Sequence, residues 1–368
     1  MFYICIFITK ALREVNFINN NKVKKVPSIL IIYTGGTIGM VNDPDTGVLA
    51  PFNFDQILNQ VPELNQFGYN LSTHSFTTLI DSSNLNIDVW IDLANIIKDN
   101  YEKYDGFVIL HGTDTMAFSA SALSFILEDL QKPVIFTGSQ LPIGTLRTDG
   151  KENIISAIEI AAASKNDQAM VPEVCIYFEN KLFRGNRTTK HNAEYFNAFE
   201  SPNYPCLAEA GINIKYNYGA IHYPTIEKDL SINTKLNPNI VICKIFPGMT
   251  RKVLHTILNI DQSKAIIIET YGAGNAPTSD WFIDEIKKVI KKGKIVLNIT
   301  QCNAGSVDMS KYETGNELSK IGVISGYDIT TEAAVAKLMC LLGQYPDNSD
   351  LINHLETPLK GEITKQEY

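Results

Sequence analysis

The stretch ILIIYTGGTIG, residues 29–39, decides the fold that the sequence predicts. Its first five residues are apolar and largely β-branched, so they predict a strand that is buried on both faces of a parallel sheet. The two glycines that follow allow a tight turn and a close approach of the backbone to a ligand. Because open parallel sheets bind ligands at the carboxyl ends of their strands, the turn is expected to present Thr37 at a ligand-binding edge.

A glycine-rich turn after a strand is also a phosphate-binding feature. This turn lacks the Gly-Lys-Ser/Thr ending and the Gly-x-Gly-x-x-Gly spacing of the nucleotide-binding loops. Taken alone it is therefore a weak signal, and catalysis at Thr37 needs support from the rest of the chain.

Similar apolar runs recur outward from this stretch, and each ends in a glycine or a polar cluster. Between them, apolar residues from Val89 to Tyr104 recur at a spacing of three to four, as in a helix that packs on a sheet. This alternation is typical of an α/β fold with parallel strands. The strands expected in the first half are Ile29–Tyr33, Phe107–Leu110, Val134–Phe136 and Val174–Phe178.

A second α/β set follows a segment, residues 222–239, that has two prolines, mixed charges and little periodicity. Two domains also suit a length of 368 residues. We expect two α/β domains, the larger N-terminal one with a mostly parallel sheet and flanking helices, and the smaller C-terminal one Rossmann-like. The expected divisions are an N-terminal extension at 1–27, a first domain at 28–221, a linker at 222–239 and a second domain at 240–368.

The second domain is expected to alternate strands and helices as the first does. Gly293 is expected to end one of its helices. The expected strands are Ile240–Phe246, Ala265–Glu269 and Lys294–Ile299, and the expected helices are Asp280–Lys292 and Thr331–Leu342.

Composition narrows the class of function. A formal net charge of −8 disfavours a nucleic-acid partner or an anionic membrane surface, and a small-molecule partner fits better. The six cysteines show no Cys-x-x-Cys spacing, so we expect reduced thiols in a cytoplasmic protein. The six histidines show no metal-binding spacing, and we expect neither a metal nor another cofactor.

The N-terminal extension has an apolar run, Met1 to Thr9, whose charges follow it instead of preceding it. The run is far shorter than the roughly 20 residues that span a bilayer. We expect a start-site extension or leader, with an export or inner-membrane signal as the alternative.

Two later motifs carry chemistry at the ends of strands. One is His111 to Thr115, in which the hydroxyl of Thr113 lies beside the carboxylate of Asp114. The alternative to a catalytic role is that Thr113 or Asp114 only caps the next helix. His111 is expected to be a packed residue and not the catalytic base. The other is Arg184 to Lys190, where a lysine near a carboxylate and a hydroxyl suits proton transfer. Its alternative is a solvated basic loop.

Taken together, the motifs resemble those of bacterial type I asparaginases in both order and spacing, over about residues 28–362. The stretches that carry the resemblance are Thr34–Met40, Asp81–Ser83, His111–Met116, Arg184–Lys190, Tyr271–Pro277 and Thr300–Cys302. The resemblance implies hydrolysis of L-asparagine to L-aspartate and ammonia. It also implies a homodimer or homotetramer, in which a neighbouring subunit helps to close a site built largely on the N-terminal domain.

The resemblance also implies roles for individual residues. Thr37 corresponds to the nucleophile that forms a β-aspartyl ester, and Thr113, Asp114 and Lys190 correspond to the group that manages protons. Asp81, Ser82 and Ser83 correspond to substrate-binding residues, as do Thr113 and Asp114. A carboxylate such as Asp114 suits an α-ammonium, and a hydroxyl such as that of Ser82 suits an α-carboxylate. Asn275 also corresponds to a substrate-binding residue, and it is expected to lie beside a neighbouring subunit's site.

The sequence departs from the family pattern in two places. Many relatives have a Gly-Tyr pair in the loop after the nucleophile, where this chain has Gly47 and Val48, so activation of Thr37 is expected to use another donor or water. Some type I members have an arginine in an allosteric asparagine site, where this chain has Glu269, so asparagine-driven allostery is not expected.

Two other functions remain as alternatives. An amidase subunit that acts on misacylated tRNA shares the motifs, but it resembles asparaginases with a substantial extra N-terminal domain, and the acidic charge disfavours tRNA. A non-catalytic binding module would keep the glycines and tolerate loss of Thr37 or Lys190, and neither residue is lost. The sequence leaves open the preference for asparagine over glutamine.

Overall fold

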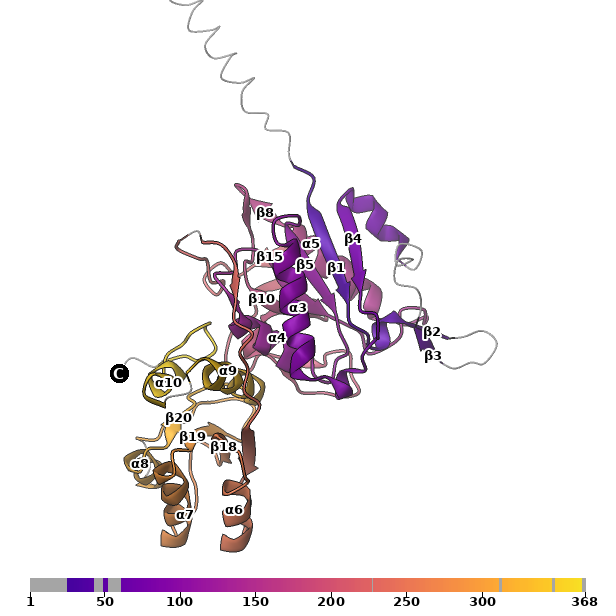
Figure 1. Cartoon of the computed structure of the whole chain (residues 1–368). Coiled ribbons are helices and arrows are strands. Elements are labelled where there is room, and N and C mark those ends of the chain that lie inside the picture. The colour runs from indigo at the N-terminus through magenta and orange to yellow at the C-terminus, as the bar shows by residue number, and fades with distance from the viewer. Residues whose placement is uncertain are drawn as a thin grey trace, which may run out of the picture.

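The computed structural model describes residues 25–42, 49–51, 61–226, 228–310, 313–345 and 348–365. These residues form a large unit and a smaller unit, each built around its own sheet (Figure 1). The two-sheet α/β fold expected from the sequence is confirmed. The expected extension at 1–27 falls almost wholly outside the described residues, and the domain boundaries stay a prediction.

The large unit contains an eight-stranded sheet. Five consecutive strands at one side of the sheet run parallel, and the three strands at the other side pair antiparallel. In spatial order the strands are β15 (Ile214–Tyr216), β14 (Ala208–Ala210), β11 (Lys181–Arg184), β10 (Val174–Phe178), β7 (Val134–Thr137), β5 (Gly106–Leu110), β1 (Ser28–Tyr33) and β4 (Asn70–Ser75).

The side chains of β1 alternate between two cores, as the pleat of a strand requires. Leu30 and Ile32 pack in the core beneath α3 (Ile87–Asn100) and α4 (Met116–Ile126). Ile29 and Ile31 pack on the opposite face beneath α5 (Gly150–Ala162). Both faces of the strand are therefore buried, which explains its unbroken apolar sequence.

The smaller unit has a four-stranded sheet in which every pair of neighbouring strands is parallel. Its strands, in order, are β17 (Ile240–Lys244), β18 (Ala265–Thr270), β19 (Ile295–Thr300) and β20 (Ile324–Ser325). One face is covered by α6 (Arg251–Leu258), α7 (Asp280–Lys291) and α8 (Glu313–Lys320), and the other by α9 (Thr331–Gln344) and α10 (Asn348–Leu355).

Helix α9 also joins the two units, because it lies against α4 of the large unit (Figure 1). Ala336 and Cys340 of α9 belong to the same core as the α4 side chains. The segment before the small sheet packs on α9 as well, and Asn237 N donates to Met339 O at 2.9 Å. Within that segment β16 (Ser231–Ile232) pairs with β6 (Leu127–Glu128).

The expected elements differ from the observed ones mainly at their ends. The helical periodicity was expected to continue to Tyr104, but α3 ends at Asn100, and Tyr101 and Tyr104 still pack against the same core. Gly293, at φ 88°, follows the end of α7 as expected, because glycine adopts a positive φ without steric cost.

Short strands complete the structure. They form three hairpins: β2 (Met40–Asn42) with β3 (Leu49–Pro51), β8 (Ser164–Lys165) with β9 (Gln168–Ala169), and β12 (Thr189–Lys190) with β13 (Phe199–Glu200). The 3-10 helices are η1 (Thr37–Gly39), η3 (Pro62–Phe67), η4 (Ser82–Asn84) and η5 (Gly185–Arg187). Within the described ranges, no helix combines the length and apolar character needed to cross a membrane.

Candidate active site

Three loops meet at the carboxyl ends of β1 and β5. The turn after β1 contacts the turn after β5 so closely that a Cβ on Gly36 would lie 2.5 Å from Gly112 N. A Cβ on Gly112 would in turn lie 2.5 Å from Ser82 Oγ, in the loop that follows β4. Both glycines are therefore required by the close approach of three backbone segments, and the strand-end motifs of the sequence converge as expected.

Thr37 begins η1, directly after the contact between Gly36 and Gly112. Gly36 has a φ of 88°, a conformation that L side chains rarely adopt. Thr37 is half-buried, and no hydrogen bond joins its Oγ1 to another residue within the described ranges. The turn thus places Thr37 at the edge of the sheet, next to the loop that carries Thr113.

The side chain of Lys190 contacts both Thr113 and Asp114. Its Nζ lies 2.8 Å from Thr113 Oγ1 and 2.7 Å from Asp114 Oδ1. The Lys190 side chain is 16% exposed, whereas that of Asp114 is 62% exposed. A partly buried amine is thus held between a hydroxyl and a carboxylate that faces solvent, which is an arrangement able to move a proton.

Gln140 is a residue of the site that the sequence did not predict. Its Oε1 accepts a hydrogen bond from Thr113 Oγ1 at 3.3 Å, and its Nε2 donates to Tyr195 O at 3.1 Å. The backbone nitrogen of Gln140 donates to both carboxylate oxygens of Asp149, at 3.1 and 3.0 Å. Gln140 lies three residues beyond the end of β7, so the strand-end rule applied to this strand would have found it.

The predicted substrate-binding residues differ in exposure. Asp81 and Ser83 are exposed, and the hydrogen bonds from Ser83 to Asp81 lower the pKa of that carboxyl group. Ser82 is buried, its side chain lies against Gly112, and its carbonyl oxygen accepts a hydrogen bond from Thr115 Oγ1 at 2.7 Å. Asp81 and Ser83 therefore have the better access to a ligand, and the binding role of all three stays a prediction.

His111 is packed, as the sequence suggested. It is buried, with Nε2 3.0 Å from Ser119 Oγ and Nδ1 2.7 Å from Gly112 O. Burial lowers the pKa of His111 to about 4, so the ring is neutral near pH 7. The capping alternative for Thr113 and Asp114 is wrong, because the N-cap of α4 is Thr115, which makes no side-chain capping bond.

The stretch before Lys190 is not a solvated basic loop, so that alternative is wrong too. Arg184 is buried and paired with Glu173, with Nε 2.6 Å from Oε2. Arg187 is 2% exposed and paired with Asp328, with Nη1 2.9 Å from Oδ2. Arg187 Nε also donates to Gly361 O at 2.7 Å. The arginines therefore hold the C-terminal part of the chain against the large unit.

Two predicted features lie apart from this cluster. Asn275 lies in the turn after β18, where its backbone nitrogen donates to Tyr271 O at 2.8 Å. Its expected place beside a neighbouring subunit's site stays a prediction. Val48, the replacement for the loop tyrosine, lies outside the described residues.

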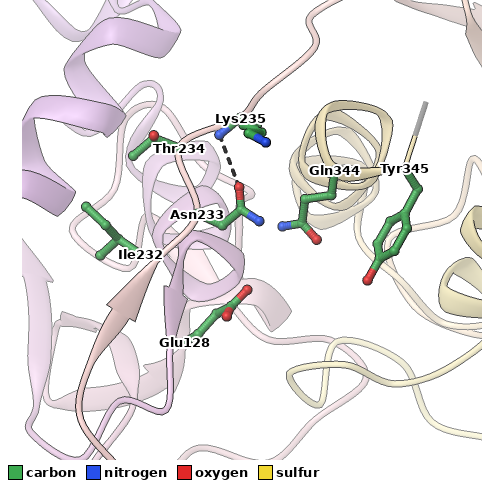
Figure 2. Close-up of a pocket in the computed structure, with 7 residues that line it drawn as sticks. All are labelled: Glu128, Ile232, Asn233, Thr234, Lys235, Gln344 and Tyr345. Atoms are coloured by element: carbon green, nitrogen blue, oxygen red, sulfur yellow. Dashed lines mark hydrogen bonds between the residues drawn. The ribbon is translucent and has the colours of Figure 1, made fainter.

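A cavity of about 500 Å³ lies elsewhere, between the linker and the end of α9. Figure 2 shows the amides of Asn233 and Gln344 pointing toward one another across it. Glu128, which also lines it, follows the far end of α4 from Thr113. The cavity is thus separate from the candidate active site. In the part of the chain that the structure describes, no cluster of three His, Cys, Asp or Glu side chains is arranged to hold a metal ion.

Comparison with known proteins identifies similar families and sequences. The family described as "Asparaginase, N-terminal" matches residues 28–222, and "Glutaminase/Asparaginase C-terminal domain" matches residues 239–354. The chain is 42% identical to L-asparaginase 1 of Escherichia coli K12, over 92% of this chain and 98% of that protein. It is 39% identical to the 60 kDa lysophospholipase of Mus musculus, over 91% of this chain and 62% of that protein.

The fold is similar to a solved structure as well. The crystal structure of L-asparaginase I from Vibrio cholerae matches with a TM-score of 0.84 and 40% sequence identity. The match covers 93% of this chain and all of the Vibrio chain.

Proposed function

Because the chain belongs to the asparaginase family of enzymes, we propose that it hydrolyses L-asparagine to L-aspartate and ammonia through a covalent intermediate on Thr37. One observation carries the mechanistic part of this proposal. Lys190 Nζ lies within 2.8 Å of Thr113 Oγ1, beside the turn that presents Thr37. This arrangement supports Thr37, after β1, as the nucleophile, and Thr113, after the neighbouring strand β5, with Lys190 as the pair that transfers protons.

In the first step, Thr37 Oγ1 attacks the side-chain carboxamide carbon of asparagine. The carbon–nitrogen bond breaks, the hydroxyl proton passes to the leaving nitrogen, and ammonia departs, leaving a β-aspartyl ester on Thr37. The tetrahedral oxyanion requires donors that are already in place, and backbone amides near Thr113 are the candidates. Splitting a stable amide hydrolysis in this way replaces one difficult step with two easier ones.

In the second step, water attacks the ester carbon, the bond to Thr37 Oγ1 breaks, and a proton returns to the threonine. We assign the removal of the proton from water to Thr113 and Lys190, whose oxygen and nitrogen are 2.8 Å apart. Gln140 Oε1 accepts a hydrogen bond from Thr113 Oγ1 at 3.3 Å, and Lys190 Nζ donates to the same hydroxyl oxygen, so the two partners hold the Thr113 hydroxyl in place.

Recognition of a free amino acid requires groups for both charged ends. The carboxylate of Asp114 accepts a hydrogen bond from Lys190 at Oδ1 and is still exposed to solvent. It therefore suits the α-ammonium of an amino acid. The hydroxyl of Ser83, which is exposed, and that of Ser82 suit the α-carboxylate. These charged and polar groups fit a zwitterion better than the acyl chain that the name of the mouse relative suggests.

The test is ammonia release by the purified protein with L-asparagine, L-glutamine and D-asparagine in parallel. The proposal predicts release from L-asparagine and none from the Thr37→Ala variant, purified identically from a host that lacks asparaginases. Asparagine and glutamine differ by one methylene, worth only ~1–3 kcal/mol, so some release from glutamine is compatible with the proposal. No release from any of the three amides would refute it.

We further propose a cytoplasmic homo-oligomer, a dimer or a tetramer. The five cysteines within the described residues are free, which suits a reducing compartment. If Asn275 of one subunit completes another subunit's site, specific activity should fall as the protein is diluted below the dissociation constant. A fully active monomer in sedimentation at the assay concentration would contradict this.

A further inference from the structure

The residue before Lys190 makes a contact that the proposed mechanism does not use. Thr189 Oγ1 donates a hydrogen bond to Glu332 Oε1 at 2.7 Å. Thr189 belongs to the large unit, whereas Glu332 lies in the first turn of α9, 143 residues later in the chain. This bond therefore ties the strand that carries the lysine to the smaller unit.

The acidic side chain of Glu332 is buried, which is unusual for a glutamate. Burial raises the pKa of Glu332, and the hydrogen bond from Thr189 opposes that shift. A buried carboxylate is costly unless it is hydrogen-bonded, so the bond to Thr189 offsets part of the cost. Glu269 lies close by, and it accepts a hydrogen bond from Thr331 Oγ1 at 3.1 Å.

An acid in the first turn of a helix also has an ordinary explanation. Its negative charge interacts favourably with the free amides at the helix N-terminus. That explanation requires a charge at position 332 but not a hydrogen bond to Thr189. The two explanations therefore make different demands, one for a charge and the other for an acceptor oxygen.

The strand that holds Lys190 is short. β12 consists of Thr189 and Lys190 only, and it pairs with β13 through two residue pairs. On its N-terminal side, Arg187 is fixed to Asp328 and Gly361. On its C-terminal side, His191 N donates to Ala198 O at 2.9 Å within the large unit. Among these contacts to the smaller unit, the one made by Glu332 is nearest to the lysine in sequence.

We propose that Glu332 is a positioning residue for the proposed hydrolysis: by accepting the hydrogen bond of Thr189, it fixes β12 so that Lys190 Nζ meets Thr113 Oγ1. This inference rests on the proposed function of Lys190. Glu332 does not touch the reacting groups in this account. It acts through geometry, and a displacement of about 1 Å at a reacting group costs on the order of 100-fold in rate.

The test compares variants that separate the acceptor from the charge. Glu332→Gln keeps an acceptor oxygen and loses the charge, and we expect a kcat within about 2-fold of wild type. Glu332→Leu and Thr189→Val each remove one end of the bond, and we expect kcat to fall roughly 10- to 100-fold with KM changed by less than about 3-fold. The double variant should be no slower than the slower single variant, because both changes break the same bond.

Thr331→Val is the matched control. It removes the neighbouring hydrogen bond to Glu269 on the same turn of α9 and leaves the bond between Thr189 and Glu332 in place. Its kcat should equal that of wild type. Thermal unfolding midpoints, measured for every variant, identify any that is slow because it is poorly folded.

A second measurement does not depend on turnover. Limited labelling of lysine amines, read by peptide mass spectrometry, should show faster modification of Lys190 in Glu332→Leu than in wild type, and no change in Glu332→Gln. Wild-type kcat and labelling in Glu332→Leu, equal losses in Glu332→Gln and Glu332→Leu, or additive losses in the double variant would each overturn the inference. An inactive wild type would refute the proposed function instead, and the labelling result would still decide whether Glu332 positions the lysine.

Discussion

Lys190 Nζ and Thr113 Oγ1 are 2.8 Å apart although 77 residues separate them in the chain. The threonine follows the carboxyl end of β5, and the lysine comes from β12, which follows β11 in the chain. The proton-managing pair therefore exists only when both parts of the large unit are folded together. Because Thr113 and Lys190 come from different segments, each can be replaced separately to test its role.

Replacement of Lys190 by methionine should lower kcat by about 100-fold or more and leave KM nearly unchanged, because we assign the amine to proton transfer and not to substrate capture. Methionine retains the apolar stem of the side chain and removes the amine. Steady-state kinetics with L-asparagine provides the measurement. A large rise in KM with kcat intact would reassign Lys190 to binding.

Gly36→Ala should lose most of the activity, because its Cβ would meet the backbone of Gly112 at 2.5 Å and displace the turn that presents Thr37. Gly68→Ala is the matched control, since Gly68 also has a positive φ, 66°, but nothing lies within 4 Å of its Cβ. Gly68→Ala should lose about 1 kcal/mol of stability from backbone strain, and Gly36→Ala should lose more because its Cβ also meets the Gly112 backbone. If kcat were equally affected in both, the contact between Gly36 and Gly112 would not be what matters.

The buried neutral His111 should make the fold sensitive to acid. Its folded pKa of about 4 lies below the ordinary value of 6.5, so the unfolded chain binds the proton first. This histidine's contribution to the free energy of unfolding is complete above pH 6.5, falls as the pH drops and is lost near pH 4. The full loss is about 3 kcal/mol.

Urea unfolding of wild type and His111→Gln between pH 7 and pH 4 isolates this effect. As the pH falls, the free energy of unfolding of wild type should decrease more than that of the variant, since glutamine does not titrate. A difference that stays constant over this range would show that His111 does not couple protonation to folding.

The buried ion pair of Lys337 and Glu362, 2.6 Å between Nζ and Oε1, should anchor the C-terminal segment that also contacts Arg187. Lys337→Met leaves an unpaired buried carboxylate and should cost roughly 3–5 kcal/mol in unfolding free energy. Lys337→Met combined with Glu362→Gln should cost less than the sum of the two single changes. Additive losses in denaturant unfolding would show that the two groups are not coupled.

The parts of the fold that depend on local pattern were predictable from the sequence. The run from Ile29 to Tyr33 is apolar at every position because the strand is buried on both faces, and the pattern states this directly. The glycine turns at Gly36 and Gly112 were likewise visible, because only glycine permits the close approach that the three loops require.

What the sequence did not reveal depends on distant partners. The sequence left open whether Arg184 and Arg187 belong to a solvated basic loop, because their partners Glu173, Asp328 and Gly361 give no sign of the pairing. Gln140 escaped notice because an amide has no distinctive motif, although it follows a strand end next to β5. Local pattern thus predicts which strand ends carry chemistry, and packing decides which side chains meet there.

The central claim, that Thr37 carries the acyl group, is tested most directly in the Thr113→Val variant. This change nearly preserves the shape of the side chain and removes the hydroxyl that we assign to deacylation, so the ester should accumulate, although the unpaired neighbours of Thr113 add ~1–3 kcal/mol of local cost. The measurement is intact-protein mass spectrometry after rapid acid quenching with L-asparagine, followed by peptide mapping. The account predicts an aspartyl adduct on Thr37 and an ammonia burst of about one equivalent or less. An adduct on another residue, or a slow variant with no adduct at saturating asparagine, would contradict it.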